Sequence, residues 1–144
     1  KIQNLANLYS FQTPRVPCEA PYFKVLGFTG VECYNVHAEK MKWEAARKTC
    51  LSEGSDLAQP SDLDALWRYL NQNGMPGDYW MGGTDAIREG EWQWLNGELI
   101  RGPWHNNQPQ GDGDCLDLLA TKEQPVLNDY ICHNAQSFIC QRKF

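Results

Sequence analysis

One short stretch, from Trp104 to Cys115, is dense in side chains that can bind a hard metal ion. Its interior offers four side-chain amides and two carboxylates within nine residues, with one proline and two glycines to bend the backbone. A second oxygen-rich pair, Asn128-Asp129, lies just before Cys132. Calcium takes about six to eight oxygen ligands from carboxylates and carbonyls on irregular loops. If a disulfide joins Cys115 to Cys132, the two groups face each other, and the sequence predicts a calcium site between them.

The bulk composition narrows the classes of ligand. The chain has 144 residues, a formal net charge of −5 and a pI near 5.1. An acidic chain without a run of Lys or Arg argues against nucleic acid and against an anionic membrane surface. No apolar stretch approaches the ~20 residues that a membrane-spanning helix needs. We therefore expect one globular domain that neither binds nucleic acid nor inserts into a membrane.

The histidines give no sign of an active site. His37, His105 and His133 are scattered, and the chain has neither a His-Glu-x-x-His zinc pattern nor a Gly-x-Ser-x-Gly nucleophile turn. The sequence therefore predicts a binding protein rather than an enzyme.

The six cysteines, an even number without a Cys-x-x-Cys pair, indicate disulfides rather than zinc ligands. Their spacing alone leaves many connectivities open. Disulfides imply an oxidising compartment, so we expect a secreted, extracellular protein. A start at Lys1 without a signal peptide agrees with a mature form from which the signal has been removed.

Two segments have the apolar periodicity of amphipathic helices. The first begins near Lys42, and the glycine of Ser52-Glu53-Gly54 ends it. The second begins at Ser61, where Ser61 and Asp64 approximate a capping box, and ends at Gly74.

The remaining pattern is typical of strands and turns. A hairpin closed by its own disulfide is expected between Cys18 and Cys33, and Asn96-Gly97 predicts a two-residue hairpin turn. Further strands are predicted at residues 34–37, 79–83, 115–119 and 137–140. Two helices followed by a β-rich half with long loops indicate an α+β fold. Residues 1–17 are predicted to form a separate N-terminal arm, which Pro14 and Pro17 end.

The order and spacing of these landmarks resemble those of a C-type lectin carbohydrate-recognition domain. The matching residues are Trp43-Glu44-Ala45-Ala46 before Cys50, Leu57-Ala58, Trp80-Met81-Gly82-Gly83, Glu89-Gly90-Glu91-Trp92-Gln93-Trp94, Asn96-Gly97, Gln108-Pro109-Gln110, Asp114-Cys115, Asn128-Asp129, Cys132 and Phe138-Ile139-Cys140. Each is weak alone, but together they are specific. The resemblance implies the C-type lectin fold over residues 18–144: two helices, antiparallel sheets and a long calcium- and ligand-binding loop region, stapled by disulfides.

The resemblance also implies pairings and site residues. The implied disulfides are Cys18–Cys33, Cys50–Cys140 and Cys115–Cys132. A principal Ca²⁺, which the sugar itself would ligate through two neighbouring hydroxyls, is expected to bind Gln108, Gln110, Asp112, Asn128 and Asp129. Tyr130 is expected to stack on the sugar, whereas Trp104, the second aromatic candidate, is expected in the core. An auxiliary Ca²⁺ would use Asp85, Glu89 and Asp114.

The sugar class follows from the Gln-Pro-Gln segment. Gln108 resembles the Gln-Pro-Asp type, which in this family goes with galactose and N-acetylgalactosamine. The chain departs from the family pattern at Gln110, at Gly113 in place of an acid, and at Leu127 in place of a tryptophan. We therefore expect a secreted, calcium-dependent lectin of innate immunity that binds microbial glycans and self-associates for avidity. The alternative is a lectin-fold module that binds protein, or a mineral or ice surface, without a working calcium–sugar site.

Overall fold

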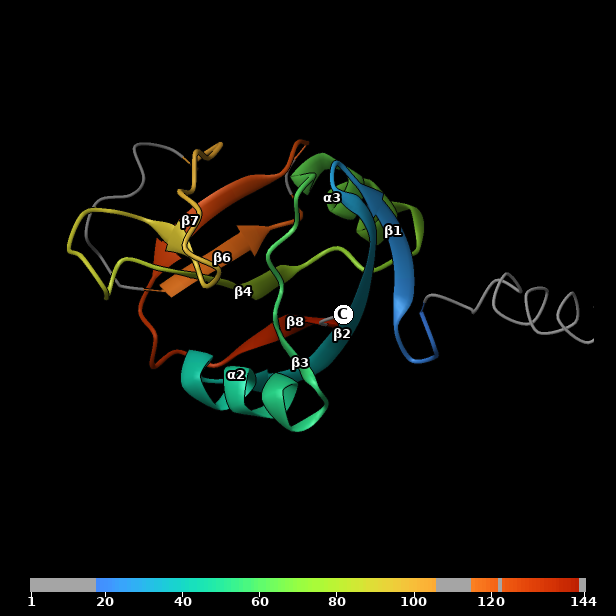
Figure 1. Cartoon of the computed structure of the whole chain (residues 1–144), viewed down its shortest axis with the longest axis horizontal. Helices are drawn as coiled ribbons and strands as arrows, with labels where there is room; N and C mark the ends of the chain where they lie inside the picture. Colours follow the sequence, from blue (N-terminus) through green and yellow to red (C-terminus); the bar gives the residue numbers. More distant parts are fainter. Residues whose placement is uncertain (1–17, 106–114, 122, 143–144) are drawn as a thin grey trace, which may run out of the picture.

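The computed structural model describes residues 18–105, 115–121 and 123–142, so the expected N-terminal arm lies outside the described residues. Its elements are arranged in one domain with the sheet between the helices (Figure 1). In chain order they are β1 (Phe23–Gly27), β2 (Gly30–Met41), α2 (Trp43–Ser52), β3 (Ser55–Leu57), α3 (Leu63–Gln72), β4 (Asp78–Thr84), β5 (Gln93–Trp94), β6 (Cys115–Leu119), β7 (Val126–Tyr130) and β8 (Gln136–Arg142).

Both predicted helices are present, and each is followed by a glycine with a positive φ angle, +77° at Gly54 and +68° at Gly74. The predicted start of the second helix is wrong by one residue. Asp62, rather than Ser61, is the N-cap, and its carboxylate accepts the N–H of Ala65 at 3.2 Å. The Ser61 hydroxyl instead accepts the N–H of Phe28 at the β1–β2 turn, so it is occupied by a contact from outside the helix.

The strands form one sheet in the order β1-β2-β8-β4-β6-β7, with β3 added to β8 and β5 added to β4. The expected antiparallel pairing is present in the sheet, and one pair adds to it a parallel element, because β4 and β8 pair in parallel through Tyr79↔Ser137 and Trp80↔Phe138. The strand expected at residues 34–37 is not separate but is the middle of β2. The short strand β3 was not predicted from the sequence.

Buried side chains cover both faces of the sheet. On the face toward α3, Leu66 and Leu70 pack with Met81, Leu116 and other fully buried residues. The opposite face, toward α2, is built around Trp80, Phe138 and the second group of buried residues. The two helices lie on opposite sides of the sheet (Figure 1), so both faces of its central strands are sealed from water.

The three implied disulfides, Cys18–Cys33, Cys50–Cys140 and Cys115–Cys132, are confirmed. They enclose segments with sequence separations of 15, 90 and 17 residues. Chain-entropy models assign about 3 kcal/mol of stabilisation to a loop of about 15 residues and somewhat more to a longer one. The third bridge fixes the start of β6 to the residues just after β7, beside the oxygen-rich stretch.

Candidate functional site

The described residues on either side of segment 106–114, which itself lies outside the described residues, are both held beside β7. On one side, the Leu127 N–H donates to Pro103 O and the His105 N–H donates to Leu127 O, both at 2.7 Å. On the other side, Cys115 pairs with Tyr130 and is bonded to Cys132. The chain therefore enters and leaves this segment within a few residues of Asn128 and Asp129.

β7 is the last strand of the sheet, and its outer edge carries the candidate ligands. Both backbone groups of Leu127 point outward, toward Pro103 and His105. Because backbone direction alternates along an antiparallel strand, the carbonyl of Asp129 points to the same outer edge. The Asp129 side chain is only 1% exposed. The outer edge thus offers the Asp129 backbone carbonyl, and the same residue carries a buried carboxylate, beside the point where the chain leaves the described residues at His105.

Asn128 and Asp129 lie on opposite faces of the strand, because successive side chains alternate. Asp129 pairs with Leu116, whereas Asn128 pairs with Asp117. The contact with Asn128 lowers the pKa of the Asp117 carboxyl and so favours its charged form, which makes the Asn128 amide NH₂ the donor. The Asn128 oxygen remains available as an acceptor or as a metal ligand.

Asp117 is a buried acid that sequence reasoning missed. Its side chain is 2% exposed, and burial raises the pKa of the carboxyl to about 7. The amides of Gln136 and Asn128 oppose this shift, and the negative charge of Asp78 adds to it. The only signal in the sequence was an acid at the centre of the otherwise apolar strand Cys115–Leu119.

Tyr130 faces away from Asp129. It is two residues after Asn128 and so shares that side chain's face of β7. Its ring packs at a tilt on Trp80, with 6.0 Å between ring centroids, and 37% of the residue is exposed. It lines a hollow together with Gln136.

The auxiliary positions lie in the turn after β4. The Asp85 carboxylate is buried and accepts the N–H of Gly90 at 3.1 Å, while Glu89 is exposed. The predicted third ligand, Asp114, lies outside the described residues, as do Gln108, Gln110 and Asp112. The calcium ligand sets therefore remain predictions.

Trp104 is a core residue, as expected. Its ring meets Trp92 edge-on, with 5.5 Å between ring centroids, and it packs against the buried cluster on the α3 side. The contact between Trp104 and Leu127 continues the pairing of β7. Trp104 therefore anchors the chain just before residue 106.

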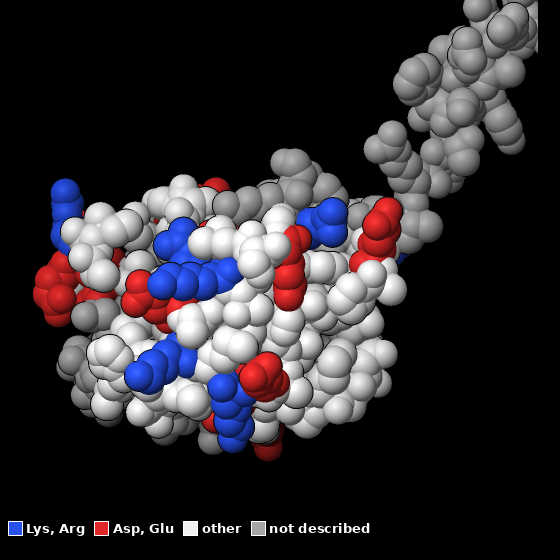
Figure 2. All heavy atoms as spheres, turned by 90° about the horizontal axis from the view of Figure 1, so that it is seen from below, with Lys and Arg blue, Asp and Glu red and all other residues white. Residues whose placement is uncertain are grey.

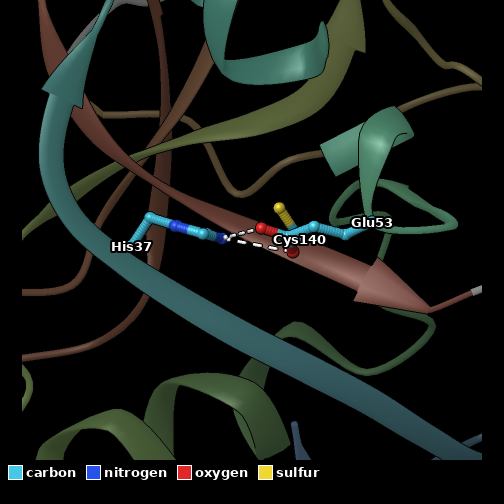
Figure 3. Close-up of side chains that lie close together, drawn as sticks. All are labelled: His37, Glu53 and Cys140. Carbon is cyan, nitrogen blue, oxygen red and sulfur yellow. Dashed lines mark hydrogen bonds and ion pairs between the residues drawn. The ribbon is translucent and has the colours of Figure 1, made fainter. Parts of the chain in front are cut away.

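A different group of metal-binding residue types is formed by His37, Glu53 and Cys140 (Figure 3). His37 Nε2 lies 3.0 Å from Glu53 Oε2, and the imidazole ring stacks on Phe138. The Cys140 sulfur is bonded to Cys50, so it is not available as a thiolate ligand. The contact between His37 and Glu53 ties β2 to the end of α2.

The surface seen in Figure 2 carries acidic and basic side chains side by side, without a continuous basic patch. Within the described part of the chain, no helix is long and apolar enough to cross a membrane. The three disulfides are typical of an extracellular-type domain.

Comparison with known proteins identifies the family. A model of the lectin C-type domain matches residues 39–142. C-type lectin domain family 4 member F of Mus musculus is 30% identical over 118 residues, which are 76% of this chain but only 21% of that protein. The galactose-specific lectin nattectin of Thalassophryne nattereri is 25% identical over 119 residues, covering 78% of this chain and 75% of its own.

The fold agrees with this match. The carbohydrate-recognition domain of the human scavenger receptor C-type lectin superposes with a TM-score of 0.71 at 26% identity, covering 88% of this chain and 99% of that domain. Proteins of this family bind ligands without catalysing reactions, which confirms the expectation of a binding protein. The chain therefore belongs to the lectin C-type domain family and has the fold of its carbohydrate-recognition domains.

Proposed function

We propose that this domain binds glycans through a calcium ion held between residues 106–114 and the outer edge of β7. The observation that carries the proposal is the position of Asp129. Its carboxylate is buried, its backbone carbonyl points to the strand edge, and the residues that flank segment 106–114, His105 and Cys115, are both held against β7. A buried carboxylate beside outward carbonyl oxygen is a donor set suited to a hard cation.

The remaining ligands are proposed from the sequence. Gln108, Gln110 and Asp112 would supply oxygens from the facing segment, and Asn128 would supply its amide oxygen. When bound, calcium would offer open positions to two neighbouring hydroxyls of a sugar. A side-chain amide can give its oxygen to the metal and its NH₂ to a sugar hydroxyl. The hydrogen bond from Asn128 to Asp117 holds that amide in one orientation. An auxiliary calcium at Asp85, Glu89 and Asp114 is proposed on the same grounds.

The sugar class that we propose is galactose or N-acetylgalactosamine. Gln108 at the first position of the Gln-Pro-Gln segment favours it, and one relative of this chain is a galactose-specific lectin. We further propose a role outside the cell, in recognition of microbial surface glycans. Single-sugar contacts are weak, so useful avidity would require several domains held together, in a homo-oligomer or in a longer protein.

Calorimetric titration with Ca²⁺, followed by a glycan array with and without chelator, tests the calcium site. We expect saturable calcium binding and glycan binding that chelator abolishes. Asp129→Asn keeps the size of the side chain but removes its charge, and it should weaken calcium binding at least tenfold. Asp64→Ala, which removes an exposed acid on α3, is the matched control and should bind like the wild type.

The contrary results are equally clear. If Ca²⁺ gives no saturable heat and the array shows no chelator-sensitive binding, the calcium–sugar site is absent. The alternative of a lectin-fold module that binds protein, or a mineral or ice surface, then takes its place. Calcium binding with mannose rather than galactose ligands would overturn only the proposed sugar class.

A further inference from the structure

A hollow of about 860 Å³ lies where β4 and β8 begin side by side, and we call it the β4–β8 hollow. Because these two strands are parallel, the loops that precede them meet at the same end of the sheet. β2 and the end of β7 complete its wall. Among its polar and aromatic lining residues are Lys40, Asp78, Tyr79, Tyr130, Asn134 and Gln136.

The lining favours a neutral polar ligand. Lys40 and Asp78 are both exposed and have opposite charges, so neither a cation nor an anion is selected by net charge. Asn134 and Gln136 each bring a donor and an acceptor. Side-chain amides both donate and accept hydrogen bonds, so they are complementary to hydroxyl groups, which also donate and accept.

One wall is an aromatic ring with a firm backing. Tyr130 packs on Trp80, which is fully buried, and leaves part of its surface open to the hollow. Such a ring can cover the apolar face of a sugar, where C–H groups gather. Tyr130 points to the face of β7 opposite Asp129, a face that it shares with Asn128, so this contact lies apart from the Asp129 side chain.

Beneath the lining lies a pair of polar atoms whose hydrogen bonds are incomplete. Asp117 Oδ1 and Gln136 Nε2 are both buried, and neither has a well-formed hydrogen bond within the described residues. The Gln136 amide faces the Asp117 carboxyl, yet the two are not in good bonding geometry. Buried polar atoms are normally paired, and a missing partner costs about 1–3 kcal/mol. Because both atoms are buried, a sugar hydroxyl reaches them only when the lining side chains shift, and it can then accept from the Gln136 amide and donate to the carboxylate.

We infer that the β4–β8 hollow is a second saccharide-binding site, independent of calcium, for a neutral sugar ring that stacks on Tyr130 and hydrogen-bonds Gln136 and Asp78. The inference stands apart from the calcium site, because none of the described calcium-ligand candidates, Asp85, Glu89, Asn128 and Asp129, lines the hollow. A domain with both sites could engage two sugars of one branched glycan.

Titration of the purified chain with methyl galactoside, methyl mannoside and N-acetylglucosamine in excess chelator tests the inference. Binding is followed by the backbone and side-chain NMR shifts of the protein. We expect at least one of these sugars to bind with a Kd in the millimolar range and to shift the Gln136 amide signals. Tyr130→Ala should weaken this binding at least tenfold, and Tyr130→Phe, which keeps the ring, should restore most of it. Asp64→Ala, the exposed-acid control, should bind like the wild type.

Other outcomes overturn the inference. If none of the three sugars shifts Gln136 in chelator, or if Tyr130→Ala binds like the wild type, the hollow is not a saccharide site. Binding of glucosamine without binding of N-acetylglucosamine would show that the hollow selects a cation instead. If Tyr130→Ala does not fold, Asn134→Ala and Gln136→Ala carry the same test, because both residues line the hollow and neither belongs to a buried cluster.

Discussion

Asp117 and Asn128 stand directly opposite each other on β6 and β7, and the amide of one donates to the buried carboxyl of the other. A carboxyl group whose pKa lies near neutrality is thus adjacent to a proposed calcium ligand. The same carboxyl also faces Gln136 at the floor of the β4–β8 hollow. The strand pair β6–β7 therefore connects the two proposed binding sites through one cluster of polar side chains.

The first prediction concerns Asp117→Asn. Burial raises the native pKa of this carboxyl to about 7, whereas the unfolded value is an ordinary 3.8. Between these values the native state holds a proton that the unfolded state has lost, so this group makes stability fall as pH rises. The loss is complete above pH 7 and amounts to roughly 4 kcal/mol at most. Urea unfolding in chelator should show Asp117→Asn to be more stable than the wild type at pH 8.

Urea unfolding of the same two proteins at lower pH provides the control. Near pH 4 the wild-type carboxyl is protonated in the native state, so the gain from Asp117→Asn should largely disappear. Asp78→Asn removes an exposed acid on the same side of the sheet and should not produce a gain of this size at pH 8. Equal stability of Asp117→Asn and wild type at both pH values would contradict the buried-acid interpretation.

The second prediction concerns Gly82, at the centre of β4. A Cβ atom added there would lie 2.6 Å from the backbone carbonyl oxygen of Leu57, which cannot move aside as a flexible side chain can. Gly82→Ala should therefore cost about 1–3 kcal/mol, the usual range for overpacking a core. Gly90→Ala is no matched control, because its φ of +80° adds backbone strain. Ala86→Gly, at an exposed turn position, serves as the control instead. Its melting temperature should be close to that of the wild type.

The third prediction concerns the disulfide that holds the candidate site. Replacing Cys115 and Cys132 together by alanine removes a bridge over 17 residues, and we expect a loss of about 3 kcal/mol in unfolding free energy. Because this bridge fixes the end of segment 106–114 beside β7, calcium affinity should fall as well. Replacing Cys18 and Cys33 should lower stability to a similar extent but leave calcium affinity unchanged. If both double variants bind calcium with equal affinity, the Cys115–Cys132 disulfide does not position the calcium site.

Much of the fold could be predicted because its signals are local. Helical periodicity located α2 and α3, and Asn96-Gly97 located a turn in which Gly97 has a φ of +95°. The parallel pairing of β4 with β8 leaves no local signal, because it joins segments more than fifty residues apart. The N-cap of α3 is Asp62 rather than the predicted Ser61, whose hydroxyl accepts a hydrogen bond from the N–H of Phe28, a residue distant in the sequence.

The candidate site could be predicted only in part, for a related reason. The adjacent pair Asn128-Asp129 was visible as oxygen-rich sequence, but strand alternation sends the two side chains to opposite faces. That alternation also turns Tyr130 away from Asp129 and toward Trp80. Asp117 was not identified as a site residue, because neither its burial nor its distant partner Gln136 can be inferred from the neighbouring residues in the sequence.

The last prediction separates the two binding sites by their response to acid. Protons compete with calcium for carboxylate ligands, so glycan binding through Asp129 and Asp112 should weaken strongly between pH 7 and pH 4. Sugar binding in the β4–β8 hollow needs no metal. In chelator, this binding should therefore persist over at least part of the range from pH 7 to pH 4. Glycan-array signals recorded at both pH values, each with calcium and with chelator, measure the two components. A calcium-dependent signal that is undiminished at pH 4 would exclude carboxylate-held calcium, because the ligands must lose their protons to bind the metal.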